Sequence, residues 1–331
     1  MIKIDTLKEV NCSIEEGGIV INDSLNATNL NFDADSIAIY DENLATFWSL
    51  DLEQCKLYRL KKDLIKRKDI KKIIISKSLN HIYIRCFAKK TIDVFDLTNL
   101  KKIASFKHND WVKDMDFCES TKILVSSDGK GFWYQWNLEE LDLEKKGKAK
   151  KSKKVFARIK IAQNGKFILT NSYNYSVNQF IIWDLETGNP IYESDESNNA
   201  DNQFKVNTYT GEFEIGGFID DETVLLYSNY NIKSYIPANE KKYFELFEYN
   251  FKTNQLKKSE FDGTIADISS SCQHLVIKNP MNPPTILTTE NKTITTIPFK
   301  WDLKNAVFST DDMQVILTPN VGTSFIYTID N

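Results

Sequence analysis

The sequence predicts an all-β fold in which one short unit recurs seven times along a chain of 331 residues. Each copy reads as three strands separated by two turns, and the third strand closes on an aromatic or apolar residue beside an acidic residue or Asn. The closing positions follow one another mostly at steps of about 40–47 residues, a spacing typical of four-stranded repeats. Aromatic residues make up 12% of the chain, which favours strands over helices. We therefore expect one repeat domain covering residues 1–331.

The unit is clearest between His108 and Leu138, where three apolar runs are separated by polar turns. Asp128-Gly129 is a dipeptide typical of the turn between two antiparallel strands. The next copy closes on Trp183-Asp184, the most regular closing dipeptide of the seven.

This unit resembles one WD repeat of the β-propeller family. That family places a His before the first strand, a Ser or Thr in the second, an Asp in the second turn and a Trp at the close of the third. The matching residues here are His108, Ser126, Asp128 and Trp136. The Gly that precedes the His in the family is a Lys here, and the closing Trp-Asp is Trp-Asn. The resemblance implies a seven-bladed β-propeller that acts as a non-catalytic scaffold.

Each blade needs a fourth strand, and the sequence indicates how the last blade obtains one. No segment follows the seventh copy, because the sequence stops at Asn331, whereas Ile2–Leu7 has strand character and belongs to no copy. We expect Ile2–Leu7 to pair near Ile326, so that the N-terminal strand completes the last blade and closes the ring. The alternative is a pair of β-sandwich domains, which predicts neither the regular period nor the unassigned N-terminal strand.

The bulk composition favours an intracellular protein with no general affinity for polyanions. The formal net charge is −4, so no global attraction to nucleic acid or to an anionic membrane is expected. The five cysteines are dispersed, as is typical of reduced thiols in the cytosol. The sequence has no signal-peptide pattern and no apolar run of membrane-spanning length. We expect a cytoplasmic location without membrane insertion.

The residues His108, Ser126 and Asp128 could be read as a catalytic set. The resemblance implies a different role, because in the family these residues and Trp136 form a buried hydrogen-bonded network within one blade. The sequence contains no metal-binding, phosphate-cradling or nucleophile-elbow motif. We therefore expect no enzyme, no cofactor and no metal site. A propeller enzyme with carboxylates in its central channel stays open as an alternative.

The resemblance also implies a partner-binding face. In WD-repeat propellers the turns between second and third strands lie on the same face as the loops that enter each first strand. The residues expected there are Trp111, Lys113, Lys130, Tyr173, Tyr175, Tyr230 and Tyr235, together with the Pro-rich loop around Met281. Exposed Trp and Tyr are enriched in binding hot spots, which favours a protein or peptide partner. The alternative is that these rings pack on their own blades.

A lysine-rich run, with seven lysines between Lys145 and Lys154, carries the second functional hypothesis. Such a run could bind RNA as part of an accessory subunit, with salt-sensitive affinity. It has no interleaved aromatic residues for base stacking. The other interpretation is a solvated loop or a charged outer strand that prevents edge-to-edge pairing.

Overall fold

The computed structural model describes most of the chain from residue 70 onward and several strands before it. The described ranges are residues 9–15, 18–21, 27–33, 36–41, 46–51, 56–59, 70–76, 78–96, 99, 101–148, 155–174, 177–194, 214–229, 243–279, 282–300, 302–309, 312–320 and 324–329. Every regular element within them is a β-strand, which confirms the predicted all-β class. This part of the chain contains no helix of the length and apolarity that crossing a membrane requires, and the cytoplasmic location stays a prediction.

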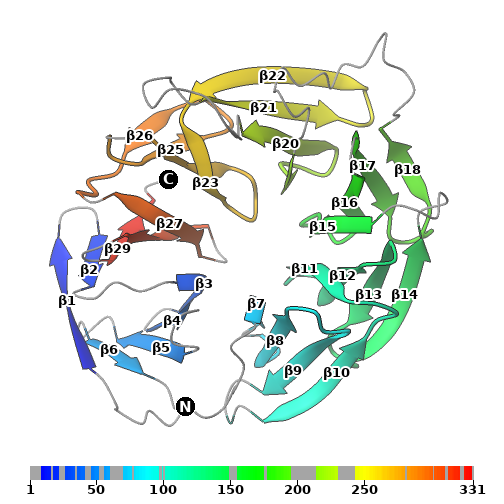
Figure 1. The fold of residues 1–331 in the computed structure, drawn as a ribbon, viewed down its shortest axis with the longest axis horizontal. Helices are drawn as coiled ribbons and strands as arrows, with labels where there is room; N and C mark the ends of the chain where they lie inside the picture. Colours follow the sequence, from blue (N-terminus) through cyan, green and yellow to red (C-terminus); the bar gives the residue numbers. More distant parts are fainter. Residues whose placement is uncertain are drawn as a thin grey trace. The chain divides into compact units, whose positions relative to one another are not determined.

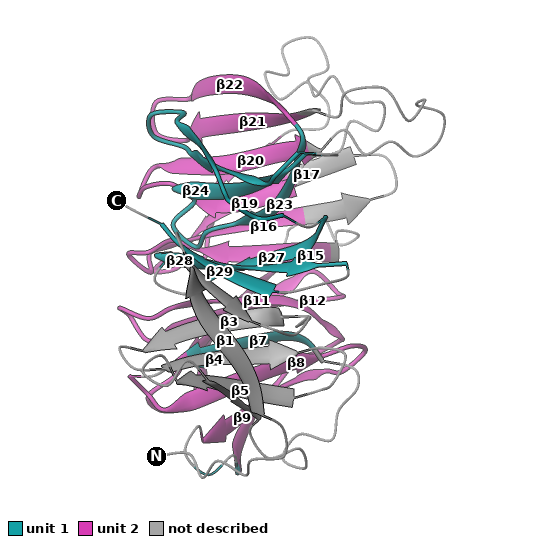
Figure 2. Ribbon diagram, turned by 90° about the vertical axis from the view of Figure 1, so that its left-hand side faces the viewer, with its two compact units in different colours: residues 1–75, 97–101, 263–331 teal, residues 76–96, 102–262 magenta. Residues whose placement is uncertain are grey.

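The chain divides into two compact units, coloured separately in Figure 2. One comprises residues 1–75, 97–101 and 263–331, and the other comprises residues 76–96 and 102–262. The prediction of a single domain over residues 1–331 stays a prediction.

The strands of the first unit lie at the two ends of the chain (Figure 1). They are β1 (Glu9–Glu15), β2 (Gly18–Ile21), β3 (Ala27–Asp33), β4 (Ser36–Asp41), β5 (Thr46–Asp51), β6 (Lys56–Arg59), β23 (Thr264–Ile268), β24 (His274–Lys278), β25 (Thr285–Thr288), β26 (Ile294–Thr296), β27 (Leu303–Phe308), β28 (Gln314–Pro319) and β29 (Ser324–Thr328). Strand β7 (Ile70–Ser76) contains the last residues of this unit before the chain enters the second one.

The second unit contains the middle strands. They are β8 (His81–Cys86), β9 (Thr91–Asp96), β10 (Lys102–Lys107), β11 (Val112–Cys118), β12 (Ile123–Asp128), β13 (Phe132–Asn137), β14 (Asp142–Lys148), β15 (Val155–Ile161), β16 (Phe167–Asn174), β17 (Val177–Asp184), β18 (Pro190–Glu193), β19 (Glu214–Phe218), β20 (Thr223–Asn229), β21 (Tyr243–Asn250) and β22 (Gln255–Asp262). Within each four-stranded sheet, strands that follow one another along the chain pair antiparallel, as the short turns between them predict.

The strands form six hydrogen-bonded sheets within the described residues, so the predicted number of seven is wrong. Five sheets have four strands each, in the orders β10-β9-β8-β7, β11-β12-β13-β14, β15-β16-β17-β18, β19-β20-β21-β22 and β23-β24-β25-β26. The sixth has nine, in the order β27-β28-β29-β2-β1-β6-β5-β4-β3. The physical reason is β1, which pairs with β2 on one side and with β6 on the other. It thereby joins strands that we expected in two separate sheets.

The strand that pairs with the C-terminal strand also differs from the prediction. It is β2, whose Ile19 lies opposite Ile326 in an antiparallel pair with β29. The expected strand Ile2–Leu7 lies outside the described residues. An N-terminal strand therefore does extend the last sheet, but it comes from a later part of the sequence than we expected.

Apolar cores fill the spaces between neighbouring sheets, because successive residues of a strand point to opposite faces. Within the second unit, Ile168, Ile181 and Trp183 pack with Trp133 of sheet β11–β14. Their sequence neighbours Leu169 and Ile182 pack in the opposite direction, with Leu226 and Phe247 of sheet β19–β22. Inside the first unit, buried residues of β24, β25, β27, β28 and β29 form a comparable core. Three of the five cysteines, Cys86, Cys118 and Cys272, are buried thiols that form no disulfide, as the cysteine pattern predicts.

The first strand of several sheets carries a β-bulge against the second strand, and the bulge positions an acidic side chain in two of them. The register shifts before Asp114 in β11 and before Asp267 in β23. The Ile159 amide donates to Asp114 Oδ2 over 3.2 Å, and the Phe308 amide donates to Asp267 Oδ2 over 2.9 Å. Each carboxylate thus satisfies a backbone amide on the first strand of the following sheet, where an unpaired edge would otherwise be costly.

Candidate functional site

Sheet β11–β14 brings His108, Ser126 and Trp136 into one buried hydrogen-bonded group. His108 Nε2 lies 2.7 Å from Ser126 Oγ, and Trp136 Nε1 donates to the same oxygen over 2.8 Å. His108 Nδ1 lies 3.1 Å from the carbonyl oxygen of Phe106. A carbonyl only accepts, so the ring proton belongs on Nδ1, and Ser126 donates its hydroxyl proton to Nε2. Every polar atom of the three side chains then has a partner.

Burial determines the protonation state of this group. His108 is 8% exposed and Ser126 is fully buried. Desolvation lowers the pKa of His108 to about 4, against the opposing effects of the Phe106 carbonyl and the Asp128 carboxylate. The imidazole is therefore neutral at physiological pH. A serine that is buried and bonded to an indole N–H is out of reach of a substrate, so this geometry favours a structural role over a catalytic one.

Asp128 organises the turn between β12 and β13. Its Oδ1 accepts the amides of Lys130 and Phe132 over 2.9 and 3.1 Å, and its Oδ2 accepts the Tyr134 hydroxyl over 2.7 Å. Burial raises the pKa of Tyr134, so its hydroxyl stays protonated. The same hydroxyl accepts the Asn109 amide over 3.0 Å. Asp128 and Tyr134 together tie the loop before β11 to the turn after β12.

The bonded loops carry an exposed surface, which we call the Trp111 face and define as residues 87–90, 108–113 and 128–132. Trp111 is 48% exposed, and the Lys113 ammonium lies 6.0 Å from the centroid of its ring. Lys130 is exposed in the adjoining turn. The structure therefore brings together three of the seven residues that we expected to bind a partner.

Backbone hydrogen bonds fix the three segments of the Trp111 face to one another. The Gly129 amide donates to the Trp111 carbonyl over 2.9 Å, and the Val112 amide donates to the Lys89 carbonyl over 2.8 Å. The His108 amide donates to the Lys90 carbonyl over 2.9 Å. An exposed indole on so constrained a loop loses little conformational entropy when it binds.

The other predicted face residues cannot be placed in the same way. The backbone of Tyr173 belongs to β16, but its side chain is outside the described part of the chain, as are Tyr175, Tyr230, Tyr235 and Met281. Sequence reasoning also missed Phe87, which is 61% exposed in the Trp111 face. Phe87 directly follows β8, so in the sequence it continues an apolar strand run and carries no signal that separates it from a core residue.

The lysine-rich run begins in β14, the outer strand of its sheet. Lys145 Nζ donates to the carbonyls of Leu185 and Glu186 over 3.1 and 2.7 Å. Lys146 and Lys148 place their ammonium groups 5.9 and 4.8 Å from the centroid of the Phe132 ring. This part of the run is a charged outer strand, one of the two interpretations without an RNA role. Residues 149–154 lie outside the described ranges.

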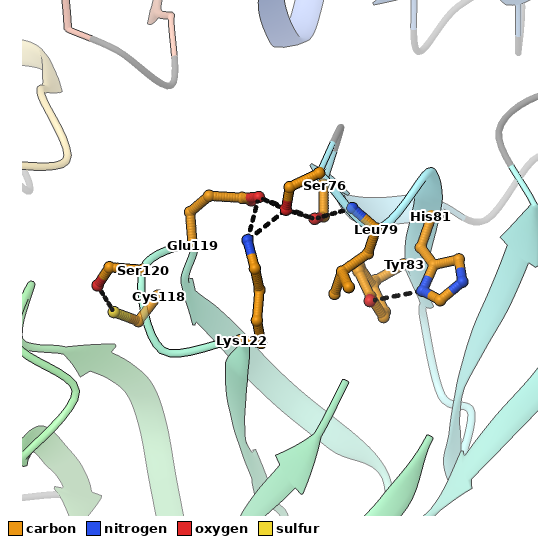
Figure 3. A network of polar contacts seen from close by, with 9 residues as sticks. Ser76, Leu79, His81, Tyr83, Cys118, Glu119, Ser120 and Lys122 are labelled. Carbon is orange, nitrogen blue, oxygen red and sulfur yellow. Dashed lines mark hydrogen bonds and ion pairs between the residues drawn. The ribbon is translucent and has the colours of Figure 1, made fainter. Parts of the chain in front are cut away.

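A second polar cluster lies in the turns around Glu119, and sequence reasoning missed it (Figure 3). Glu119 accepts hydrogen bonds from Ser76 over 3.2 Å, from Lys122 over 2.9 Å and from Ser78. Burial alone would raise the pKa of Glu119, but the bonds from Ser78 and Lys122 outweigh it and lower the pKa. Nearby, the Ser120 hydroxyl donates to the Gln163 carbonyl over 3.0 Å. These contacts satisfy polar groups between adjacent turns, and they offer no group poised for chemistry.

Within the described residues, no group of three or more His, Cys, Asp or Glu side chains is arranged to hold a metal ion.

Comparison by sequence matches no family model and no curated protein. Comparison by structure finds a chain titled "Kuenenia stuttgartiensis Hydrazine Synthase", with a TM-score of 0.62 over 93% of this chain and 97% of that one. The protein described here is therefore a β-propeller. At 10% sequence identity the match carries the fold alone, and 1593 solved chains match this common architecture.

The β-propeller repeats its internal bonds from sheet to sheet. Trp183 Nε1 donates to Thr170 Oγ1 over 3.0 Å in sheet β15–β18, just as Trp136 donates to Ser126 in sheet β11–β14. The polar residue that closes the third strand accepts backbone amides in the next turn, as with Asp184 and the Thr187 amide over 2.7 Å. In these two sheets the recurring sequence pattern therefore encodes hydrogen bonds that tie the second strand to the third.

Proposed function

We propose that this β-propeller is a non-catalytic, WD-repeat-like scaffold that binds a protein or peptide partner through the Trp111 face. The observation that carries the proposal is an indole that is 48% exposed on a loop fixed by backbone bonds to two neighbouring turns. Rigid, exposed Trp side chains are enriched among the residues that dominate binding energy. The buried hydrogen-bonded group beneath the loop supports the same interpretation, because it stabilises the platform and is not accessible to a substrate.

We also propose that pairing of β2 with β29 closes the propeller by tying its N-terminal strands to its C-terminal ones. Closure removes a free sheet edge and stiffens the scaffold.

The RNA-binding hypothesis for residues 145–154 receives less support. Lys145 donates to two backbone carbonyls of the neighbouring sheet, so it is not free to bind phosphate.

The proposal is tested by affinity purification from the native cells with wild-type protein and a Trp111→Ala variant. Ile191→Ala is the matched control, since Ile191 is 44% exposed on the outer strand β18. We expect the Trp111 variant to fold normally by circular dichroism and to lose partners that the wild type and the control both retain. Equal recovery of the same proteins by all three would contradict the choice of this face.

A further inference from the structure

The Trp111 face is strongly basic although the whole chain is acidic. Its exposed or partly exposed cations continue from the loops onto the outer strand β14, and we call them the basic strip: Lys89, Lys90, Lys113, Lys130, Lys146 and Lys148. The formal net charge of the chain is −4. The strip is therefore a local concentration of positive charge and does not reflect the composition as a whole.

An ion pair, close side chains and the strand register make the strip continuous. Lys90 Nζ lies 3.9 Å from Asp110 Oδ1. A Cβ placed on Gly129 would lie 3.1 Å from Asp110 Oδ2 and 3.3 Å from Lys113 Cε, so these side chains meet over the turn that carries Lys130. Two residues later, Phe132 pairs with Lys148 in the sheet register. The beginning of the lysine-rich run thus adjoins the predicted partner face.

Few carboxylates offset this charge. Asp110 forms an ion pair with Lys90 at 3.9 Å. Asp128 is fully buried, and its carboxylate accepts hydrogen bonds from the turn amides and from Tyr134. Glu144 on β14 accepts the Gln135 side-chain amide over 2.8 Å. Most of the positive charge in the strip is therefore available to a ligand.

Largely exposed aromatic side chains lie at one end of the strip only. Among the described residues, the large exposed aromatic side chains are Phe87 and Trp111, and both belong to the Trp111 face. Further along the strip, the Phe132 ring is already approached by two lysine ammonium groups. A single-stranded nucleic acid bound along the strip would need rings for successive bases to stack on. The strip beyond Lys130 offers none, and its cations are all Lys, which lack the bidentate geometry of Arg.

We propose that the Trp111 face binds an acidic peptide segment, with an apolar side chain anchored at Phe87 and Trp111 and a run of Asp or Glu along the basic strip. This inference rests on the proposed scaffold function and names the chemistry of its partner. The aromatic pair supplies contact area, and the lysines supply charge complementarity, which sets association rate and specificity. Salt weakens the attraction, because exposed charges are screened over about 10 Å at 0.1 M ionic strength.

The test is fluorescence anisotropy with short labelled probes on the full chain. One probe peptide has a leucine followed by a run of glutamates. A second replaces the leucine by glycine, a third replaces the glutamates by glutamines, and an oligouridylate of equal length is the fourth. We expect the first probe to bind and the second and third to bind at least tenfold more weakly. Its affinity should fall as salt is raised, and intrinsic fluorescence should change because Trp111 is exposed.

Variants separate the strip from the rest of the surface. The combined variant Lys113→Glu, Lys130→Glu and Lys146→Glu should weaken the first probe at least tenfold. The matched control reverses three exposed lysines elsewhere, as Lys166→Glu with Lys252→Glu and Lys257→Glu. If charge reversal perturbs folding by circular dichroism, the corresponding Lys→Gln set replaces it.

Equal binding by the strip variant and the control would overturn the proposal, as would a preference for oligouridylate over the acidic peptide. These outcomes are distinguishable from failure of the scaffold function. A protein partner lost from Trp111→Ala but retained by the strip variant would leave the scaffold in place and refute the acidic ligand.

Discussion

Lowering the pH from 7 to 5 should destabilise the folded protein through His108, because its burial opposes protonation. The pKa is about 4 in the folded state and the ordinary value is 6.5. Between these two values the unfolded chain binds the proton and the folded chain does not. The contribution of His108 to stability is therefore complete above pH 6.5 and is lost as the pH falls toward 4.

The size of the effect follows from the two pKa values. Proton linkage gives a loss of about 2 kcal/mol between pH 7 and pH 5 for a single histidine shifted in this way. The hydrogen bonds of His108 explain why the folded protein cannot accommodate a protonated ring. A proton on Nε2 would face Ser126 Oγ, which already accepts the Trp136 indole N–H, and the serine hydroxyl proton would then lose its acceptor.

The assay is urea unfolding at both pH values for wild-type protein and a His108→Gln variant. The variant should be less stable at pH 7, but its stability should fall by about 2 kcal/mol less on going to pH 5. His81 and His274, whose pKa values are also lowered by burial, are present in both proteins and cancel in the comparison. An NMR titration of the His108 ring in the folded protein gives the pKa directly. A native pKa near 6.5, or equal pH dependence in both proteins, would refute the reasoning.

Two further predictions concern the sheets. Gly147→Ala should destabilise the protein by about 1–3 kcal/mol in urea unfolding, because the new Cβ would overlap the indole ring of Trp133 at Cε2. The control is Lys146→Ala, whose side chain is exposed beside Gly147. Equal effects of the two substitutions would contradict the packing argument. Deleting residues 1–21 should raise hydrogen exchange in β29 and lower the melting temperature, since β2 pairs with it. Deleting residues 1–8 alone should have little effect. The reverse result would restore the earlier N-terminal strand as the one that completes the last sheet.

The part of the fold that could be predicted from the sequence depends on local patterns. The Asp128-Gly129 dipeptide predicted a turn, and the structure has it between β12 and β13. The recurring apolar runs predicted strands that pair in sequence order. Likewise the resemblance drew attention to His108, Ser126 and Trp136, which the structure brings within hydrogen-bonding distance.

The rest of the fold depends on pairing between strands that lie far apart in the sequence, and a single sequence does not specify such pairs. Strand β1 pairs on both sides and reduces seven expected sheets to six. The residue types of Glu9–Glu15 do not predict that β1 pairs with β6 as well as with β2. The bond between Asp114 and the Ile159 amide spans 45 residues, and carboxylates are too frequent in this chain for such a pair to be recognised in advance.

The candidate surface was only partly predictable for a related reason. Exposure depends on how turns from different strands meet, so Trp111 could be selected as a Trp in a loop, whereas Phe87 could not be distinguished from a core residue. The meeting of the lysine-rich strand with the Trp111 face became evident only from the register between Phe132 and Lys148.

The most direct test of the scaffold function places a photo-crosslinking amino acid at position 111 of the full chain in its native cells. The same group at position 191, on β18, is the control. The account predicts a discrete covalent adduct with one partner protein from position 111 and none from position 191. Adducts from position 191 alone, or none from position 111 while the protein still co-purifies with its partner, would contradict it.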